Sequence, residues 1–189
     1  FYLKTYEGEE NDNISIFAEK FNSDKPQKSD AKFELFANNV SFKDSKVKII
    51  DEGFEDSEIF NLNEINIKAK KLLIRGPTVF TDIKKLSLKA RRGFVIKDLI
   101  ADFSYTTTDL KLEKLNLKTE GSSINGDILL SYDEIVGMSD FENSVSISAG
   151  FENSQISTND LNAFYNEFAK SQFIDLTGVF NGTLNNFAF

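Results

Sequence analysis

Strict alternation of apolar and polar side chains is the feature that most limits what this chain can fold into. Leu99, Ala101 and Phe103 share one side of an extended segment, and Asp98 and Asp102 lie on the other. The same period of two returns in several later segments. Such alternation is typical of strands that are buried on one face and exposed to solvent on the other, so we expect a mainly β protein.

A repeated motif is superimposed on the alternation. The pattern apolar-x-x-apolar-polar-apolar-Lys occurs four times, beginning at Ala37, Leu62, Ile83 and Leu112. The last two copies lie 29 residues apart, and their shared register continues beyond the motif. A repeat of this length indicates supersecondary units stacked one after another.

Each unit has the form of a hairpin. Glycine supplies the positive φ of tight turns, so we expect turns at Gly121 and Ser122 and, one unit earlier, at residues 91–93. The two-residue gap between Leu112 and Leu115 breaks the alternation. Either a β-bulge or a tight turn would accommodate it.

The period changes between Asp160 and Lys170. The apolar positions there have helical spacing and are Leu161, Phe164, Tyr165 and Phe168. Thr158 or Asn159 can cap the start, so we expect a short amphipathic helix of about three turns. The strand pattern then resumes, with a hairpin turn predicted at Asn181-Gly182.

Composition argues against an enzyme. The chain has no His and no Cys, which removes the commonest general base, the thiolate nucleophile and the usual zinc ligands. The acidic run at residues 51–58 lacks the spacing of a calcium loop. We therefore expect no catalytic residue, no metal site and no cofactor.

Charge argues against a nucleic-acid partner. The net charge is −8, and basic residues are concentrated between Lys25 and Lys118. The only arginines are Arg75, Arg91 and Arg92, whereas nucleic-acid binders favour Arg-rich patches. The lysines fit a solvated outer face. No apolar run is long enough to form a membrane-spanning helix.

A sheet of stacked hairpins has one large apolar face that must be covered. The chain contains 19 Phe and no Trp, and ordinary monomers avoid wide apolar patches in water. The sheet can pack on a second sheet, close into a barrel, or curl around an apolar ligand. The residue pattern alone leaves these three solutions open.

Residues 63–132 resemble the hairpin repeats of TamB-type proteins, within the wider AsmA-like group. The similarity is carried by the runs Lys85–Lys89, Asp98–Tyr105 and Leu110–Thr119, and it extends through Ile156–Leu161 to the segment Gly178–Leu184. The resemblance is to members from Bacteroidota-type bacteria. It implies an elongated, twisted sheet of repeated hairpins curled into an open groove, called a β-taco, with one short helix near residues 160–170.

The resemblance also implies a function. Family members are anchored in the inner membrane of diderm bacteria, span the periplasm and meet an outer-membrane barrel of the BamA type. They move phospholipid between the two membranes, with a debated role in assembling outer-membrane proteins. The expected partners are therefore phospholipid acyl chains, together with the barrel and the inner membrane through regions outside this chain.

On this hypothesis a set of apolar side chains lines the groove. These residues are Val40, Phe42, Ile65, Ile67, Leu86, Leu88, Leu99, Ala101, Phe103, Leu115, Leu117, Ile128 and Leu130. Ordinary core packing is the alternative role for each of them. Two other functions also stay open, namely a scaffold that assists outer-membrane protein assembly by β-augmentation, and a purely structural β-solenoid or adhesin-like module.

Four regions follow from these patterns. Residues 1–30 hold one or more strands and a polar loop, and residues 31–157 form the repeated hairpins of the groove. Residues 158–171 form the short helix, and residues 172–189 form a hairpin that continues into a C-terminal region outside the chain. Both ends read as strands already under way, so we expect the chain to be part of a longer protein.

Overall fold

The computed structural model describes residues 2–8, 34–53, 58–90, 93–133, 141–164, 167–183 and 185–188. Ten strands form one sheet in which spatial order follows sequence order. The strands are β1 (Tyr2–Thr5), β2 (Glu34–Asp51), β3 (Glu58–Arg75), β4 (Thr78–Lys89), β5 (Val95–Tyr105), β6 (Asp109–Thr119), β7 (Ser123–Ser131), β8 (Ser146–Ser157), β9 (Phe173–Thr183) and β10 (Asn186–Ala188). All neighbours are antiparallel except β1, which runs parallel to the end of β2.

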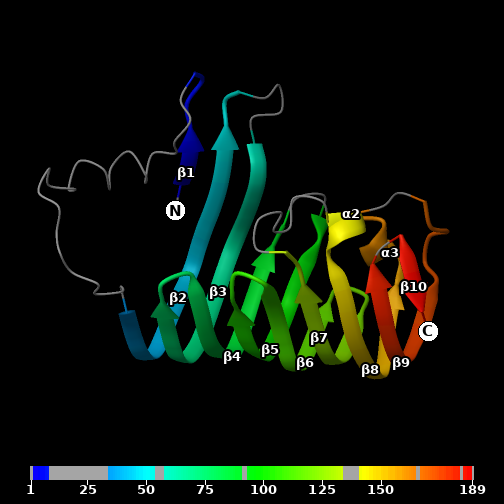
Figure 1. Cartoon of the computed structure of the whole chain (residues 1–189). Helices are drawn as coiled ribbons and strands as arrows, with labels where there is room; N and C mark the ends of the chain where they lie inside the picture. Colours follow the sequence, from blue (N-terminus) through cyan, green and yellow to red (C-terminus); the bar gives the residue numbers. More distant parts are fainter. Residues whose placement is uncertain are drawn as a thin grey trace, which may run out of the picture.

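The sheet is open and curled. Its long strands bend at one level, so the sheet forms a trough whose axis runs across the strands (Figure 1). The first and last strands do not pair, so the trough does not close into a barrel. The expected fold class, a mainly β sheet of repeated hairpins curled into an open groove, is confirmed.

Register shifts interrupt the strands where the repeat motif has its two-residue gap. Between Leu112 and Leu115 the pairing of β6 with β7 shifts by one residue, and Lys114 there has a φ of 52°. The backbone N–H of Lys114 donates to the Asp127 carboxylate at 2.7 Å. The gap is therefore a β-bulge and not a tight turn. Bulges bend a strand and increase its twist, which favours a curled sheet.

The copies of the motif at Leu62 and Ile83 carry similar irregularities. Register shifts fall between Asn63 and Asn66 in β3 and between Ile83 and Leu86 in β4. A further shift in β8 has Asn153 at a φ of 45°. Because the shifts recur along the sheet, successive strands can bend together.

Of two turns predicted from the sequence, one is confirmed and one is wrong. The turn at Gly121 and Ser122 is confirmed, since β6 ends at Thr119 and β7 begins at Ser123. The turn predicted at Asn181-Gly182 is wrong, because both residues lie inside β9 and pair with β8. Gly182 has a φ of 147°, so the extended chain uses its conformational freedom without reversing direction.

Within the described ranges, two short helices interrupt the strand order. α2 (Phe141–Ser144) precedes β8 and was not predicted. α3 (Thr158–Leu161) begins where the sequence indicates, with Ser157 rather than Thr158 or Asn159 as its N-cap. It is one turn long instead of three, because the chain turns away at its C-cap Asn162 and forms a loop that returns to β9.

Several predictions concern residues outside the described parts of the chain. These are the polar loop at Ser23–Asp30, the turn residues Arg91 and Arg92, part of the acidic run at residues 54–57, and the helix position Tyr165.

Candidate functional site: the apolar trough

Cross-strand pairing arranges apolar side chains in continuous rows on one face of the sheet. Residues directly opposite each other in neighbouring strands point to the same face, so the pairing of the strands defines each row. One row crosses β2 to β8 and contains Leu35, Ile74, Val79, Tyr105, Leu110, Leu130 and Ile147. A second crosses β2 to β7 and contains Phe42, Ile67, Leu86, Leu99, Leu117 and Ile124.

A third row extends the surface toward the C-terminal end of the sheet. It crosses β5 to β9 and contains Phe103, Leu112, Ile128, Ala149 and Phe180. We call the surface formed by these rows the apolar face, and the opposite surface the polar face. Each row crosses at least five neighbouring strands, so the apolar face runs continuously along the trough.

All thirteen residues predicted to line a groove lie on the apolar face. Most of them belong to the three rows described above. Val40 and Ala101 belong to a further row of directly opposite residues, which runs from Val40 through Ala69 and Ile83 to Ala101. Ile65, Leu88 and Leu115 follow from their spacing in β3, β4 and β6. The structure therefore brings the whole predicted set together. Contact of these residues with lipid stays a prediction.

The middle of the apolar face is closely packed. Leu99, Ala101 and Leu115 are buried, and partly buried neighbours from β4 to β7 pack against them. Those neighbours are Ile83, Leu86, Ile96, Leu112, Leu117, Ile124 and Ile128. These side chains form the floor of the trough, so substitutions there will affect stability as well as any ligand.

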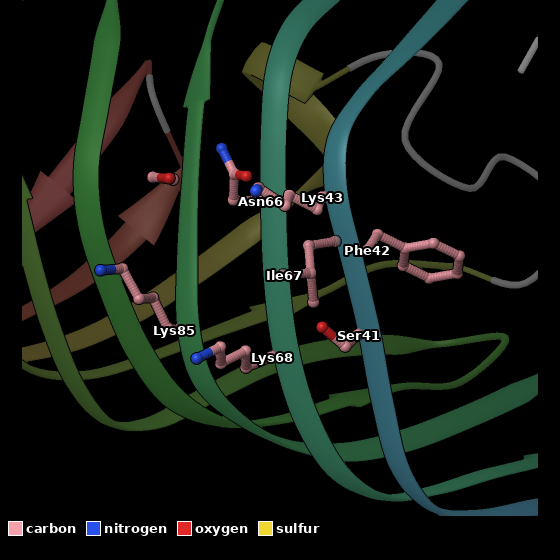
Figure 2. A pocket seen from close by; sticks show the side chains of 8 residues that line it. Ser41, Phe42, Lys43, Asn66, Ile67, Lys68 and Lys85 are labelled. Atoms are coloured by element: carbon pink, nitrogen blue, oxygen red, sulfur yellow. The ribbon is translucent and has the colours of Figure 1, made fainter.

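Toward the N-terminal end of the sheet the apolar face is more open. Phe42 keeps 55% of its surface exposed, although it lies in the same row as the buried Leu99. Figure 2 shows Phe42 pointing away from Lys68 and Lys85, which project from the other side of the strands. Phe42 is therefore a position where the apolar face can be altered without removing a packed core residue.

An anchored loop borders the trough where β8 leads into β9. Thr119 and Ser122, in the turn between β6 and β7, both donate their hydroxyl hydrogens to the Asp160 carboxylate. The Ser122 hydroxyl also accepts the backbone N–H of Ser157 at 2.9 Å. A Cβ at Gly121 would lie 2.6 Å from the Cβ of Ser157, so only glycine permits this approach.

The far side of this loop contacts the preceding unit. The rings of Phe94 and Phe164 meet edge to face with their centroids 4.9 Å apart. Three hydrogen bonds between Thr158 and Gln172 hold the two ends of the loop together. The backbone N–H and the hydroxyl of Thr158 both donate to the Gln172 carbonyl, and the backbone N–H of Gln172 donates to the Thr158 hydroxyl. The segment predicted as a helix of about three turns thus begins with the single turn of α3, and its described residues contact two neighbouring turns.

The opposite rim holds a buried tyrosine. The Tyr132 hydroxyl donates to the Thr106 carbonyl at 3.0 Å, and its backbone N–H donates to the Thr108 carbonyl at 2.8 Å. Burial raises the pKa of Tyr132 to about 12, with smaller contributions from Tyr105 and Asp109. This contact ties the end of β7 to the turn between β5 and β6.

The sequence analysis missed several residues of the apolar face. The row at the rim includes Ile74 and Val79, which flank the turn at Gly76 and Pro77, together with Ile147 in β8. The Gly-Pro pair was the available signal, because it marks a turn whose flanking residues continue the alternation. Phe180 was missed because the wrong turn at Asn181-Gly182 ended the predicted strand there.

The described residues contain no cluster of three or more acidic side chains placed to hold a metal ion. None of the helices in the described ranges is long and apolar enough to cross a membrane. No protein-family model, curated protein sequence or solved structure matches the chain.

Proposed function

We propose that the trough carries phospholipid acyl chains along its apolar face, as one segment of a periplasmic path between the inner and outer membranes. The observation that carries this proposal is the continuity of the apolar rows, one of which crosses seven neighbouring strands. No second sheet covers this face in the described part of the chain, where all strands belong to one sheet.

The energetics fit such a role. Burying one methylene stabilises by about 0.8 kcal/mol, so exposing a 16-carbon chain to water costs about 12 kcal/mol. A continuous apolar surface offsets this cost at every step and offers no single deep binding site. Movement requires binding that is favourable enough to admit the chain and weak enough to release it. Polar headgroups can stay in water at the open side of the trough (Figure 1).

Assembly of outer-membrane proteins by β-augmentation is the second candidate function. β10 pairs only with the last residues of β9, from Asn181 to Thr183, so the edge of β9 before Asn181 has one neighbour among the described strands. Phe173 and Val179 on this edge strand are 60% and 62% exposed. An apolar strand with an open edge is a template for an added strand.

Lipid that copurifies with the chain tests the first proposal. The chain is expressed in the periplasm of a diderm bacterium, purified without detergent and analysed by native mass spectrometry and lipid extraction. We expect bound phospholipid in a stoichiometric fraction of the molecules. Purified chain that is folded and free of phospholipid would contradict the proposal.

A matched pair of variants separates the trough from general hydrophobicity. Phe42→Glu places a charge on the apolar face, and Phe36→Glu places the same charge on the same strand at a residue of similar exposure, 55% against 59%. Phe36 points to the polar face. It lies in a row of directly opposite residues that continues through Leu73 and Phe80 to Ser104. We expect Phe42→Glu to reduce bound lipid several-fold and Phe36→Glu to leave it unchanged.

A further inference from the structure

The polar face of β2 to β4 contains a cavity surrounded by lysines. Its volume is about 390 Å³, and the polar residues that line it are Ser41, Lys43, Asn66, Lys68, Lys85 and Ser87. Phe42 and Ile67, from the second apolar row, complete its lining. An adjacent cavity of about 280 Å³ shares Lys68 and adds Lys70 and Lys84. The residues lining the two cavities include no Asp and no Glu. We call these five lysines the lysine cluster.

The lysine cluster brings like charges together. Lys68 lies directly opposite Lys85 in the pairing of β3 with β4, and like charges in that position destabilise a sheet. Within the described ranges, ion pairs are seen for Lys84, whose ammonium lies 3.5 Å from Asp82, but not for Lys43, Lys68, Lys70 or Lys85. Among the described residues, no ion pair offsets the charge of Lys43, Lys68 and Lys85 at the larger cavity.

Two nearby carboxylates, those of Glu64 and Asp82, are engaged with other lysines. Glu64 pairs with Lys89 at 2.7 Å, and Asp82 also pairs with Lys71 at 3.3 Å. Figure 2 shows Lys43, Lys68 and Lys85 projecting from three neighbouring strands on the side opposite Phe42. An anion in the cavity would therefore meet ammonium groups from three strands.

Two adjacent bulges build the wall of this cavity. Asp44 in β2 and Glu64 in β3 both have positive φ, at 48° and 50°. The Asn66 side chain links them, because its Oδ1 accepts the backbone N–H of Asp44 at 3.1 Å and its Nδ2 donates to the Glu64 carbonyl at 2.9 Å. Bulges alter the local twist and spacing of strands, so the cavity is part of the fold.

We propose that the lysine cluster binds a phosphate-bearing anion. Lysine ammonium groups are compact, mobile charges that suit phosphate, and the hydroxyls of Ser41 and Ser87 add neutral donors. Free phosphate and the phosphate of a lipid headgroup share this chemistry. The lysines can be tested separately from the trough, because Lys68 and Lys85 project from the side of the strands opposite Phe42.

Two titrations of the full 189-residue chain test the proposal. In the first, inorganic phosphate is added while backbone amide shifts are followed by NMR. In the second, the chain is sedimented with vesicles of phosphatidylglycerol and phosphatidylcholine, or of phosphatidylcholine alone. Saturable shifts confined to β2–β4 indicate a site for free phosphate. Sedimentation with only the anionic vesicles, without such shifts, indicates a headgroup site.

The variant Lys68→Gln/Lys85→Gln should weaken whichever binding is found by about fivefold or more. The control Lys118→Gln/Lys170→Gln removes the same charge from residues outside the cluster and should change affinity less than about twofold. The test variant should keep its melting temperature, because it removes a repulsive pair. Absence of binding in both titrations, or equal losses in the two variants, would overturn the proposal.

Discussion

Three single glycine-to-alanine substitutions test the register between β7, β8 and β9. At Gly126 the backbone has a φ of 149°, and an added Cβ would lie 1.8 Å from the carbonyl oxygen of Gly150. At Gly178 the φ is 147°, but an added Cβ would meet no atom within 4 Å. At Gly150 an added Cβ also meets nothing, and φ lies outside the left-handed range.

The three variants separate backbone strain from steric contact. Gly150→Ala should change the free energy of unfolding by less than about 1 kcal/mol, since it only restricts the unfolded chain. Gly178→Ala should cost about 1–3 kcal/mol from its backbone conformation. Gly126→Ala adds a clash with backbone that cannot rotate away, so β8 must shift and the loss should reach about 4 kcal/mol or more.

Urea denaturation followed by circular dichroism measures these free energies, and hydrogen exchange locates the damage. We expect Gly126→Ala to increase amide exchange in β7 and β8 and to leave β3 and β4 protected. The reasoning is refuted if Gly126→Ala and Gly178→Ala agree within about 0.5 kcal/mol, because the close approach of Gly126 to Gly150 would then be absent.

Three further outcomes are expected. Asp127→Ala should lower stability by about 1–3 kcal/mol because the N–H of Lys114 loses a charged acceptor, and Asp127→Asn should recover part of the loss in urea denaturation. Asp160→Ala should cost a similar amount, and hydrogen exchange should then rise in the loop that follows α3 and in the turn at Ser122. Absorbance titration should reveal one tyrosine ionising near pH 12, and Tyr132→Phe should abolish it. Because the folded state holds this proton more tightly, the contribution of Tyr132 to stability should be constant below pH 10 and fall as pH rises from 10 to about 12.

The sequence alone was sufficient to predict the one-sided sheet. Period-two alternation fixes which side chains share a face. The gap between Leu112 and Leu115 leaves a bulge and a tight turn as alternatives, and the pairing of β6 with β7 identifies it as a bulge. The alternation and the gap both involve residues close together in the chain, so they can be recognised in a single sequence. The closed alternatives, a second sheet or a barrel, differ only in long-range pairing, which alternation does not encode.

The errors came from local signals that tertiary pairing overrides. Asn181-Gly182 favours a turn in isolation, but both residues find partners in β8 and stay extended. The helical spacing after Asp160 fails because the carboxylate of Asp160 is held by the turn at Ser122, and Phe164 packs on Phe94. Neither contact can be read from residues close in sequence.

The lysine cluster could not be predicted from the sequence for a different reason. Its members come from β2, β3 and β4, and their convergence depends on the register that places Lys68 opposite Lys85. The sequence predicts a lysine-rich outer face, but the two bulges at Asp44 and Glu64 that shape the cavity become evident only in the folded sheet.

Photolabelling measures most directly whether acyl chains contact the apolar face. A phospholipid with a diazirine in its acyl chain is incorporated during expression and activated by light, and labelled peptides are identified by mass spectrometry. We expect adducts on residues of the apolar face, such as Phe42, Leu88 and Leu130, and none on Phe36 or Phe80 of the polar face. Equal labelling of both faces, or labelling confined to the polar face, would contradict the account.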